Sequence, residues 1–213
     1  MLEMNIPARK LKMSAVKNIV RFPAIKANGG KTILVESILE SKYCLHLEFD
    51  STVETYIPQP RTFAIPSESE ENRYTPDFEV HYICGQRKYV EVKPSHRASS
   101  EHYQLLFSRF ELSLEKTLTK FLLVNETEIL RQPLLSNYEK LYQYRKRPTI
   151  DMRNLHQFAE IHRVSMPLSR LISELENQIS LREIYTWLAL GYLRFDINSE
   201  ELSMMTEVEF DVC

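Results

Sequence analysis

Strand-like alternation of apolar and polar positions predicts a β-hairpin within residues 73–94. Two segments rich in Val, Ile and Tyr, residues 78–83 and 89–92, lie on either side of Gly85, the only glycine of this stretch. Such segments are typical of strands, and a central glycine favours a tight turn. We therefore expect two antiparallel strands joined by a turn at residues 84–87.

The segment before the hairpin has a helical period. Between residues 32 and 49, apolar side chains recur at intervals of three and four residues, which predicts one helix with a broad buried stripe. Glu36 and Glu40 are four residues apart and would lie on the same side of that helix. Because glutamates on a helix are usually solvated, two interpretations stay open: an exposed pair, or a contribution to a site at the hairpin.

The remaining segments of the first part alternate between strands and helices. A helix is expected after the hairpin, beginning near residue 101, with Ser99 or Ser100 as its N-cap. An order of helix, strands, helix and strand is that of an α/β fold, in which helices cover the sheet that contains the hairpin. The other expected strands are one that ends at Pro58, one at residues 61–65 and a buried one at residues 120–124.

Residues 149–213 predict a second, smaller domain that is mainly helical. The Tyr-, Lys- and Arg-rich segment that ends at Pro148 marks the boundary, so the first domain is expected to span residues 1–145. A capping box opens the third helix of the second domain, Gly191 ends that helix, and residues 192–197 predict a strand. This order resembles a winged-helix module. The three helices are expected at residues 151–162, 167–178 and 180–190.

Composition is that of a soluble globular protein. Apolar residues form 43% and charged residues 26% of the 213 positions. No apolar run approaches the ~20 residues of a membrane-spanning helix, and the basic N-terminal stretch lacks the apolar centre of a secretory signal. The three cysteines are odd in number and show no paired spacing, which favours neither a disulfide framework nor a zinc site. We therefore expect a cytoplasmic protein with no membrane partner.

Charge is distributed unevenly, although the net charge is only -2. Residues 1–35 are strongly basic, whereas residues 196–213 carry acidic side chains and no basic one. A basic arm can follow a phosphate backbone, but it is equally consistent with a solvated terminus. The side chains of this arm that we expect to contact DNA are Lys10, Lys12, Lys17 and Arg21. His96 and Arg97, in the segment after the hairpin, are expected as further DNA contacts, with ordinary loop residues as the alternative.

The residues that could bind a metal or act in catalysis are expected at one end of the hairpin. Pairing about the turn brings Asp77 close to Lys93, and Glu91 shares a face with Lys93 because strand side chains alternate. Two carboxylates and one amine suit a divalent cation, which prefers hard oxygen ligands, with the lysine near a substrate anion. Pro-Asp followed by Glu-x-Lys on the next strand is the pattern of the PD-(D/E)xK nucleases. The alternative is a surface hairpin on which Glu91 and Lys93 are solvated neighbours.

Further landmarks occur in order around this pattern, and together they resemble TnsA, the endonuclease subunit of heteromeric transposases. The resemblance covers most of residues 1–145, and the C-terminal helices look like the smaller second domain of that family. The landmarks are Asn18-Ile-Val-Arg-Phe-Pro23, Val35-Glu-Ser-Ile-Leu-Glu40, Leu47-Glu-Phe-Asp50, Gln59-Pro60, Tyr74-Thr-Pro-Asp-Phe78 and Glu91-Val-Lys-Pro94.

The resemblance implies a restriction-endonuclease-like fold, a mixed sheet flanked by helices, followed by a small winged-helix-like domain. It implies cleavage of the 5′ strands at transposon ends during cut-and-paste transposition in a bacterial cytoplasm. The implied cofactor is Mg²⁺, with Mn²⁺ as a substitute. The implied partners are double-stranded DNA, a TnsB-like transposase subunit that cuts the 3′ ends, and a TnsC-like ATPase regulator.

The resemblance also implies four site residues. Glu40 matches the helix glutamate of the family's active site, Asp77 its central metal-binding aspartate and Lys93 its catalytic lysine. Glu91 occupies a position where the family has Glu or Gln. The expected metal ligands are Glu40, Asp77, Glu91 and the backbone carbonyl of Val92, and Lys93 is expected to position the attacking water and offset phosphate charge.

Two other functions stay open. A standalone PD-(D/E)xK restriction or repair nuclease would need its own sequence-recognition domain, and the third C-terminal helix carries a single basic residue, Arg182. A non-catalytic DNA-binding scaffold would have no need of all four site residues together.

Overall fold

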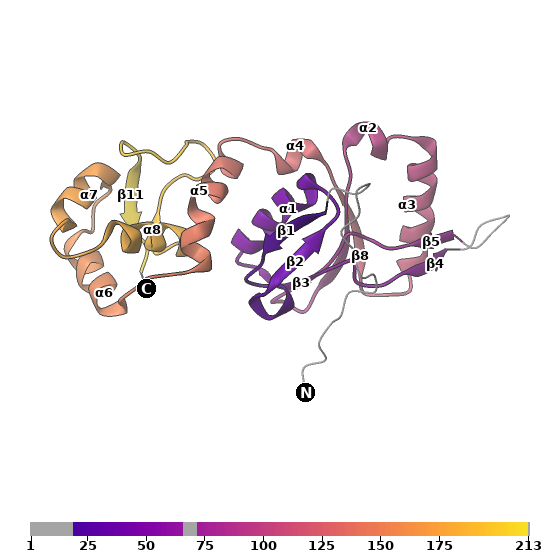
Figure 1. Cartoon of the computed structure of the whole chain (residues 1–213), viewed down its shortest axis with the longest axis horizontal. Coiled ribbons are helices and arrows are strands. Elements are labelled where there is room, and N and C mark those ends of the chain that lie inside the picture. Colours follow the sequence, from indigo (N-terminus) through magenta and orange to yellow (C-terminus); the bar gives the residue numbers. More distant parts are fainter. Residues whose placement is uncertain (1–18, 66–71, 213) are drawn as a thin grey trace. The chain divides into compact units, whose positions relative to one another are not determined.

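The structure, a computed structural model, describes residues 19–65 and 72–212. It divides the chain into two compact units, Met1–Leu130 and Arg131–Cys213, whose described parts are labelled from β1 to α4 and from α5 to β11 in Figure 1. The division lies earlier in the chain than the expected boundary at residues 145–149. The reason is that residues 134–146 form a helix, α5, that packs on helix α8 (Leu181–Leu190) of the second unit.

A mixed four-stranded sheet is the centre of the first unit. Its strand order is β3-β6-β7-β8, and all neighbours are antiparallel except β7 and β8, which are parallel. Phe78 pairs with Val90 and His81 with Arg87, so the predicted antiparallel hairpin is confirmed, with its turn at residues 83–86. The strands are β3 Val53–Pro58, β6 Phe78–Tyr82, β7 Arg87–Val92 and β8 Lys120–Val124, and the helices packed on them are α1 Ile38–Phe49 and α3 Glu101–Leu114.

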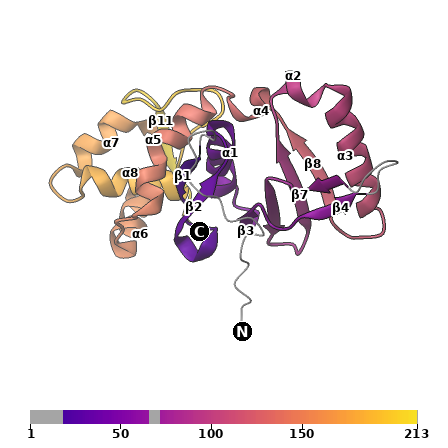
Figure 2. The ribbon, with the colours of Figure 1, turned by 45° about the vertical axis from the view of Figure 1, so that its right-hand side comes forward.

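Helices cover both faces of this sheet. The ring of Phe78 contacts α1 through Tyr43, with ring centroids 5.6 Å apart, and the ring of Tyr89 contacts α3 through Phe110 at 5.8 Å. In both views of the ribbon, α1 and α3 lie on opposite sides of the strands (Figures 1 and 2). The expected α/β class, a mixed sheet flanked by helices, is therefore confirmed.

The two edge strands of the sheet form where they were predicted, but the predicted burial of β8 is not observed. β8 forms at the expected position, but its residues are mostly exposed or half-buried, and Leu122 is 37% exposed. The expectation of a buried strand is wrong, because β8 has a neighbour only on its β7 side. β3 is the other edge and ends at Pro58, as expected for a residue without a backbone N–H group.

Two further antiparallel hairpins and three short helices complete the first unit. β1 pairs with β2, and β4, at the predicted strand 61–65, pairs with β5. Asn125 caps helix α4, since its side chain accepts hydrogen bonds from the N–H groups of Thr127 and Glu128. These elements are β1 Val20–Pro23, η1 Asn28–Gly30, β2 Thr32–Val35, β4 Phe63–Ile65, β5 Asn72–Tyr74, α2 Ser95–Ala98 and α4 Glu126–Ile129.

The single helix predicted at residues 32–49 is wrong in its first part. Strand β2 occupies the beginning of this segment, and α1 starts only at Ile38. Ser37 is the N-cap, and its Oγ atom accepts a hydrogen bond from the N–H group of Glu40 at 3.1 Å. Glu36 therefore precedes the helix, and the expected placement of Glu36 and Glu40 on one helix side does not occur.

The second unit consists of helices and a small three-stranded sheet, with strand order β10-β11-β9. The three predicted helices are confirmed as α6, α7 and α8. Ser180 caps α8 by accepting from the N–H group of Glu183, and Gly191 ends it with a φ of 82°. The elements are α5 Leu134–Lys146, α6 Met152–Ile161, β9 Met166–Pro167, α7 Leu168–Leu175, α8 Leu181–Leu190, β10 Leu193–Arg194 and β11 Glu207–Phe210.

The end of the chain is more structured than its acidic composition indicates. The strand predicted at residues 192–197 is limited to the two residues of β10, which is a correction. β11, which was not predicted, lies between β9 and β10 and buries Val208. Within the described residues, no helix combines the length and apolar content that crossing a membrane requires.

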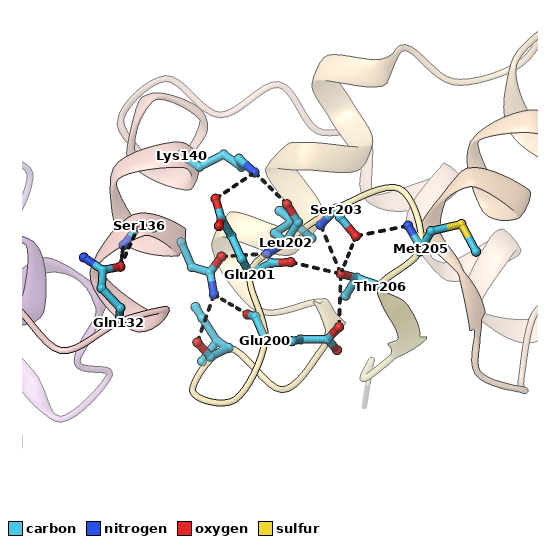
Figure 3. A network of polar contacts seen from close by, with 11 residues as sticks. Gln132, Ser136, Lys140, Glu200, Glu201, Leu202, Ser203, Met205 and Thr206 are labelled. Carbon is cyan, nitrogen blue, oxygen red and sulfur yellow. Dashed lines mark hydrogen bonds and ion pairs between the residues drawn. The ribbon is translucent and has the colours of Figure 1, made fainter.

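A polar network holds the loop between β10 and β11 against α5 (Figure 3). The buried amide of Asn137 donates to the carbonyl oxygens of Ile197 and Glu200, at 2.9 and 2.8 Å, and accepts from the N–H group of Leu202 at 2.8 Å. Lys140 donates to the carbonyl oxygen of Leu202 at 2.6 Å. Backbone groups that would otherwise be buried without partners are thereby satisfied.

Candidate active site

Asp77 lies just before β6 and is held against β7. Its Oδ2 atom accepts a hydrogen bond from the N–H group of Val92 at 2.8 Å, and its carbonyl oxygen accepts one from the N–H group of Gln59 at 2.8 Å. Both contacts are fixed by strand pairing, because Val92 ends β7 and Gln59 follows β3. Asp77 therefore lies at the Glu91–Lys93 end of the hairpin, where pairing about the turn predicts it.

Glu91 is buried on the face of the sheet that α3 covers. Its Oε2 atom accepts a hydrogen bond from the hydroxyl group of Tyr74 at 2.8 Å, and its Oε1 atom lies 2.8 Å from the Nζ atom of Lys93. The same Nζ atom lies 4.7 Å from the ring centroid of Tyr103, on α3. The alternative of a solvated Glu–Lys pair on a surface hairpin does not fit, because the Glu91 side chain is only 5% exposed.

Glu40 reaches the same region from the first turn of α1. It is buried, and its two carboxylate oxygens accept hydrogen bonds from the hydroxyl group of Ser37 and from the N–H group of Glu36, both at 2.8 Å. Together with the bond from Glu40 N–H to Ser37, this is a reciprocal cap of the helix start. Glu40 is thus fixed in position by backbone and hydroxyl donors.

Burial raises the pKa values of Asp77 and Glu40. For Asp77, loss of solvation is the largest cause and the charges of Glu91 and Glu40 add to it, although the N–H group of Val92 opposes the shift. For Glu40, loss of solvation is again the largest cause, its two hydrogen bonds oppose it, and the charges of Glu36 and Glu91 raise the pKa further. The carboxylates of Glu40, Asp77 and Glu91 are therefore close enough to repel one another.

Lys93 keeps its charge in this site. Burial alone would lower the pKa of its ammonium group, but the neighbouring carboxylates of Glu91 and Asp77 outweigh burial and raise that pKa. A lysine with a raised pKa is a poor base at neutral pH. Its chemistry here is therefore that of a fixed positive charge, which can offset the charge of an anion.

The carboxylates of the candidate site can supply oxygen ligands for a divalent cation. Glu40, Asp77 and Glu91 come from three separate elements, and a cation of charge two would relieve their mutual repulsion. In the described ranges 19–65 and 72–212, no three His, Cys, Asp or Glu side chains are close enough to hold a metal ion as they stand. Carboxylate oxygens are the type of ligand that a hard divalent cation prefers, so the three residues fit such a cation chemically. Binding requires their side chains to turn toward one point.

The other predicted site residues are distributed as follows. Arg21 is exposed on β1, and His96 and Arg97 are exposed on α2, which begins two residues after Lys93. Val92 contributes its N–H group to Asp77, and the role expected for its carbonyl oxygen stays a prediction. Lys10, Lys12 and Lys17 lie outside the described residues.

Two residues of this region were not predicted from the sequence. Tyr74 fixes Glu91 through its hydroxyl group, and Gln59 binds the carbonyl oxygen of Asp77 through its N–H group. A usable signal existed for Tyr74, because a tyrosine in a buried strand needs a hydrogen-bond partner for its hydroxyl group. For Gln59, a polar residue between two prolines at a strand end indicates only a turn.

Comparison with known proteins identifies no family. No protein-family model matches the chain, and the search of curated proteins finds no match.

Proposed function

We propose that the first unit is a divalent-metal-dependent DNA endonuclease with a restriction-endonuclease-like fold. We further propose that the chain is the TnsA-like subunit of a transposase and cleaves the 5′ strands at transposon ends. The observation that carries the proposal is the placement of three acidic side chains and one lysine at one end of a mixed sheet. Asp77 is held on the N–H group of Val92, and Glu91 lies 2.8 Å from the Nζ atom of Lys93. Glu40 is near enough to raise the pKa of Asp77. Buried like charges are costly to keep for stability alone, which supports a role in binding a cation and a phosphate.

Each residue has a separate task in this proposal. Glu40, Asp77 and Glu91 would hold the metal ion through their carboxylate oxygens, with Val92 as the further ligand. When bound, Mg²⁺ or Mn²⁺ supplies the Lewis acidity that activates a water molecule and stabilises the phosphate charge. Lys93 remains protonated beside Glu91, faces the phosphate as a fixed cation and orients the attacking water. Tyr74 keeps Glu91 in place.

The proposal assigns supporting roles to the remaining parts. His96 and Arg97 are exposed and lie close to Lys93 along the chain, and in this proposal they and the exposed Arg21 contact the DNA backbone. The second unit, proposed to be winged-helix-like, serves protein contacts, because α8, the helix expected to read DNA in such a module, carries a single basic residue, Arg182. The proposed partners are double-stranded transposon ends, a TnsB-like subunit and a TnsC-like ATPase.

The test is strand cleavage of a plasmid that carries the transposon ends, with Mg²⁺ and with or without the two partner subunits. We expect 5′-strand cuts at the ends only in the complete mixture, because an active free subunit would damage host DNA. We expect Lys93→Ala to lower the cleavage rate about 100-fold or more, as for loss of a group that stabilises phosphate charge. The matched control is Lys88→Ala, which removes the lysine over the Tyr82 ring near the turn of the same hairpin and should leave the rate unchanged.

Other outcomes separate the alternatives. Sequence-specific cleavage by the chain alone would indicate a standalone nuclease. DNA binding without cleavage in any mixture would indicate a non-catalytic scaffold. Equal rates for the Lys93→Ala and Lys88→Ala variants would remove Lys93 from the mechanism.

A further inference from the structure

Gln59 combines two unusual features next to Asp77. Its side chain is buried, and its Oε1 atom has no hydrogen-bond partner among the described residues. Its backbone has a φ of 47°, in the left-handed region that residues other than glycine seldom occupy. Unpaired buried oxygens and left-handed backbone both cost free energy, and such costs are concentrated at functional sites.

The position of Gln59 is fixed relative to the candidate site. Pro58 pairs with Phe78 at the end of the β3–β6 ladder, and the next contact is the hydrogen bond from Gln59 N–H to the carbonyl oxygen of Asp77 at 2.8 Å. Gln59 is therefore joined through its backbone to Asp77, one of the three carboxylates of the candidate site. A shift of one residue would displace the other.

A purely structural role does not explain the amide. If the side chain only filled space, an apolar residue of similar length such as methionine would do so without an unpaired oxygen. If the residue only formed the turn, glycine or asparagine would tolerate the left-handed backbone better. What glutamine adds is a neutral oxygen acceptor that stays available in the ligand-free protein.

We propose that Gln59 is a ligand-binding residue of the site, whose Oε1 atom binds the hydrated divalent cation directly or through one of its waters. This inference rests on the proposed function, since the cation is the one that Glu40, Asp77 and Glu91 attract. Amide oxygens are hard ligands, and Mg²⁺ keeps several waters that donate hydrogen bonds to such acceptors. A neutral oxygen also adds an acceptor without adding another negative charge to three that already repel one another.

The test measures stability and cation binding of the full chain with Gln59→Met. Removing an unpaired oxygen should raise the melting temperature of the metal-free protein by about 2–4 °C. Removing a cation contact should weaken Mn²⁺ binding about 10- to 100-fold, measured by calorimetry with a transposon-end duplex present. Gln143→Met, on the exposed side of α5, is the matched control and should change neither quantity.

The outcomes separate this inference from the proposed function. If the wild type binds Mn²⁺ and Gln59→Met binds it equally well, the role of Gln59 is overturned while the metal site stands. If Gln59→Met melts at a lower temperature than the wild type, the amide has a structural partner and the inference is likewise overturned. If the wild type binds no divalent cation, the proposed function fails and the inference falls with it.

Discussion

The hydrogen bond between Tyr74 and Glu91 provides the sharpest test of the site geometry. Tyr74→Phe removes only the hydroxyl group, because the ring is 6% exposed and keeps its contacts with Phe110 and Phe107, at 4.7 and 6.2 Å between centroids. A hydrogen bond to a charged group contributes about 1.5–3 kcal/mol, and Glu91 retains its contact with Lys93. We therefore expect the variant to lose about 1.5–3 kcal/mol of the free energy of unfolding.

The assay is urea denaturation followed by two probes. Far-ultraviolet circular dichroism reports both units, whereas the fluorescence of Trp187, the only tryptophan, reports the second unit. The loss should appear in the circular dichroism, and where the two units unfold independently the fluorescence midpoint should not move. Tyr82→Phe is the control, because its hydroxyl group has no hydrogen bond within the described part of the chain and its ring is half-buried. A loss below about 0.5 kcal/mol for Tyr74→Phe, equal to that of the control, would refute the reasoning.

Three further predictions concern buried polar groups. Asp77→Asn should stabilise the metal-free protein at pH 8, because a carboxyl group whose pKa is raised by folding destabilises the fold as the pH rises through that pKa. The gain in the free energy of unfolding, measured by urea denaturation, should disappear in acid, below the pKa of the unfolded chain. Each unit by which the folded pKa exceeds the unfolded pKa corresponds to about 1.4 kcal/mol. An equal gain at both pH values would contradict the assigned cause. Asn137→Ala should cost about 3–4 kcal/mol, read from Trp187 fluorescence, because it leaves three backbone groups of the β10–β11 loop without partners. Glu48→Gln should cost about 1.5–3 kcal/mol by circular dichroism, because the fully buried carboxylate accepts from two backbone N–H groups and the Tyr56 hydroxyl; a neutral effect of either change would show that water replaces these bonds.

Features with strong local signals were predictable from the sequence. The hairpin around Gly85 depends on alternation and one turn, and α8 depends on a capping box and a C-terminal glycine, so each is encoded within a short segment. The start of α1 shows the limit of this reasoning. An apolar period runs through residues 32–49 and predicts one helix, whereas the Ser37–Glu40 cap interrupts that period and sets the start of α1. A serine followed three residues later by a glutamate is a signal that could have placed the helix start correctly.

Features that depend on distant contacts were not predictable in the same way. α5 ends in basic and aromatic residues that resemble a linker, and its membership of the second unit follows from its packing on α8. β11 is four residues long and became a strand because β9 and β10 supply partners on both sides. Short strands are specified by their neighbours more than by their own residues.

The residues of the candidate site also differ in whether local sequence or distant contacts determine their position. Hairpin pairing alone predicts that Asp77, Glu91 and Lys93 lie together. The contact between α1 and the hairpin depends on tertiary packing, so the sequence pattern leaves a site role for Glu40 as one of two interpretations, and the resemblance to TnsA is what favours it. Gln59 belongs to a landmark of that resemblance, Gln59-Pro60, but receives no role from it, because an unpaired oxygen is visible only when its surroundings are known. The residues hardest to find from sequence are thus those that conflict with stability: carboxylates that repel one another, and an amide oxygen that has no hydrogen-bond partner among the described residues. Proteins keep such unfavourable groups where a bound ligand stabilises them. The buried like charges and the unpaired oxygen are therefore difficult to predict from local sequence, and they also indicate where the functional site lies.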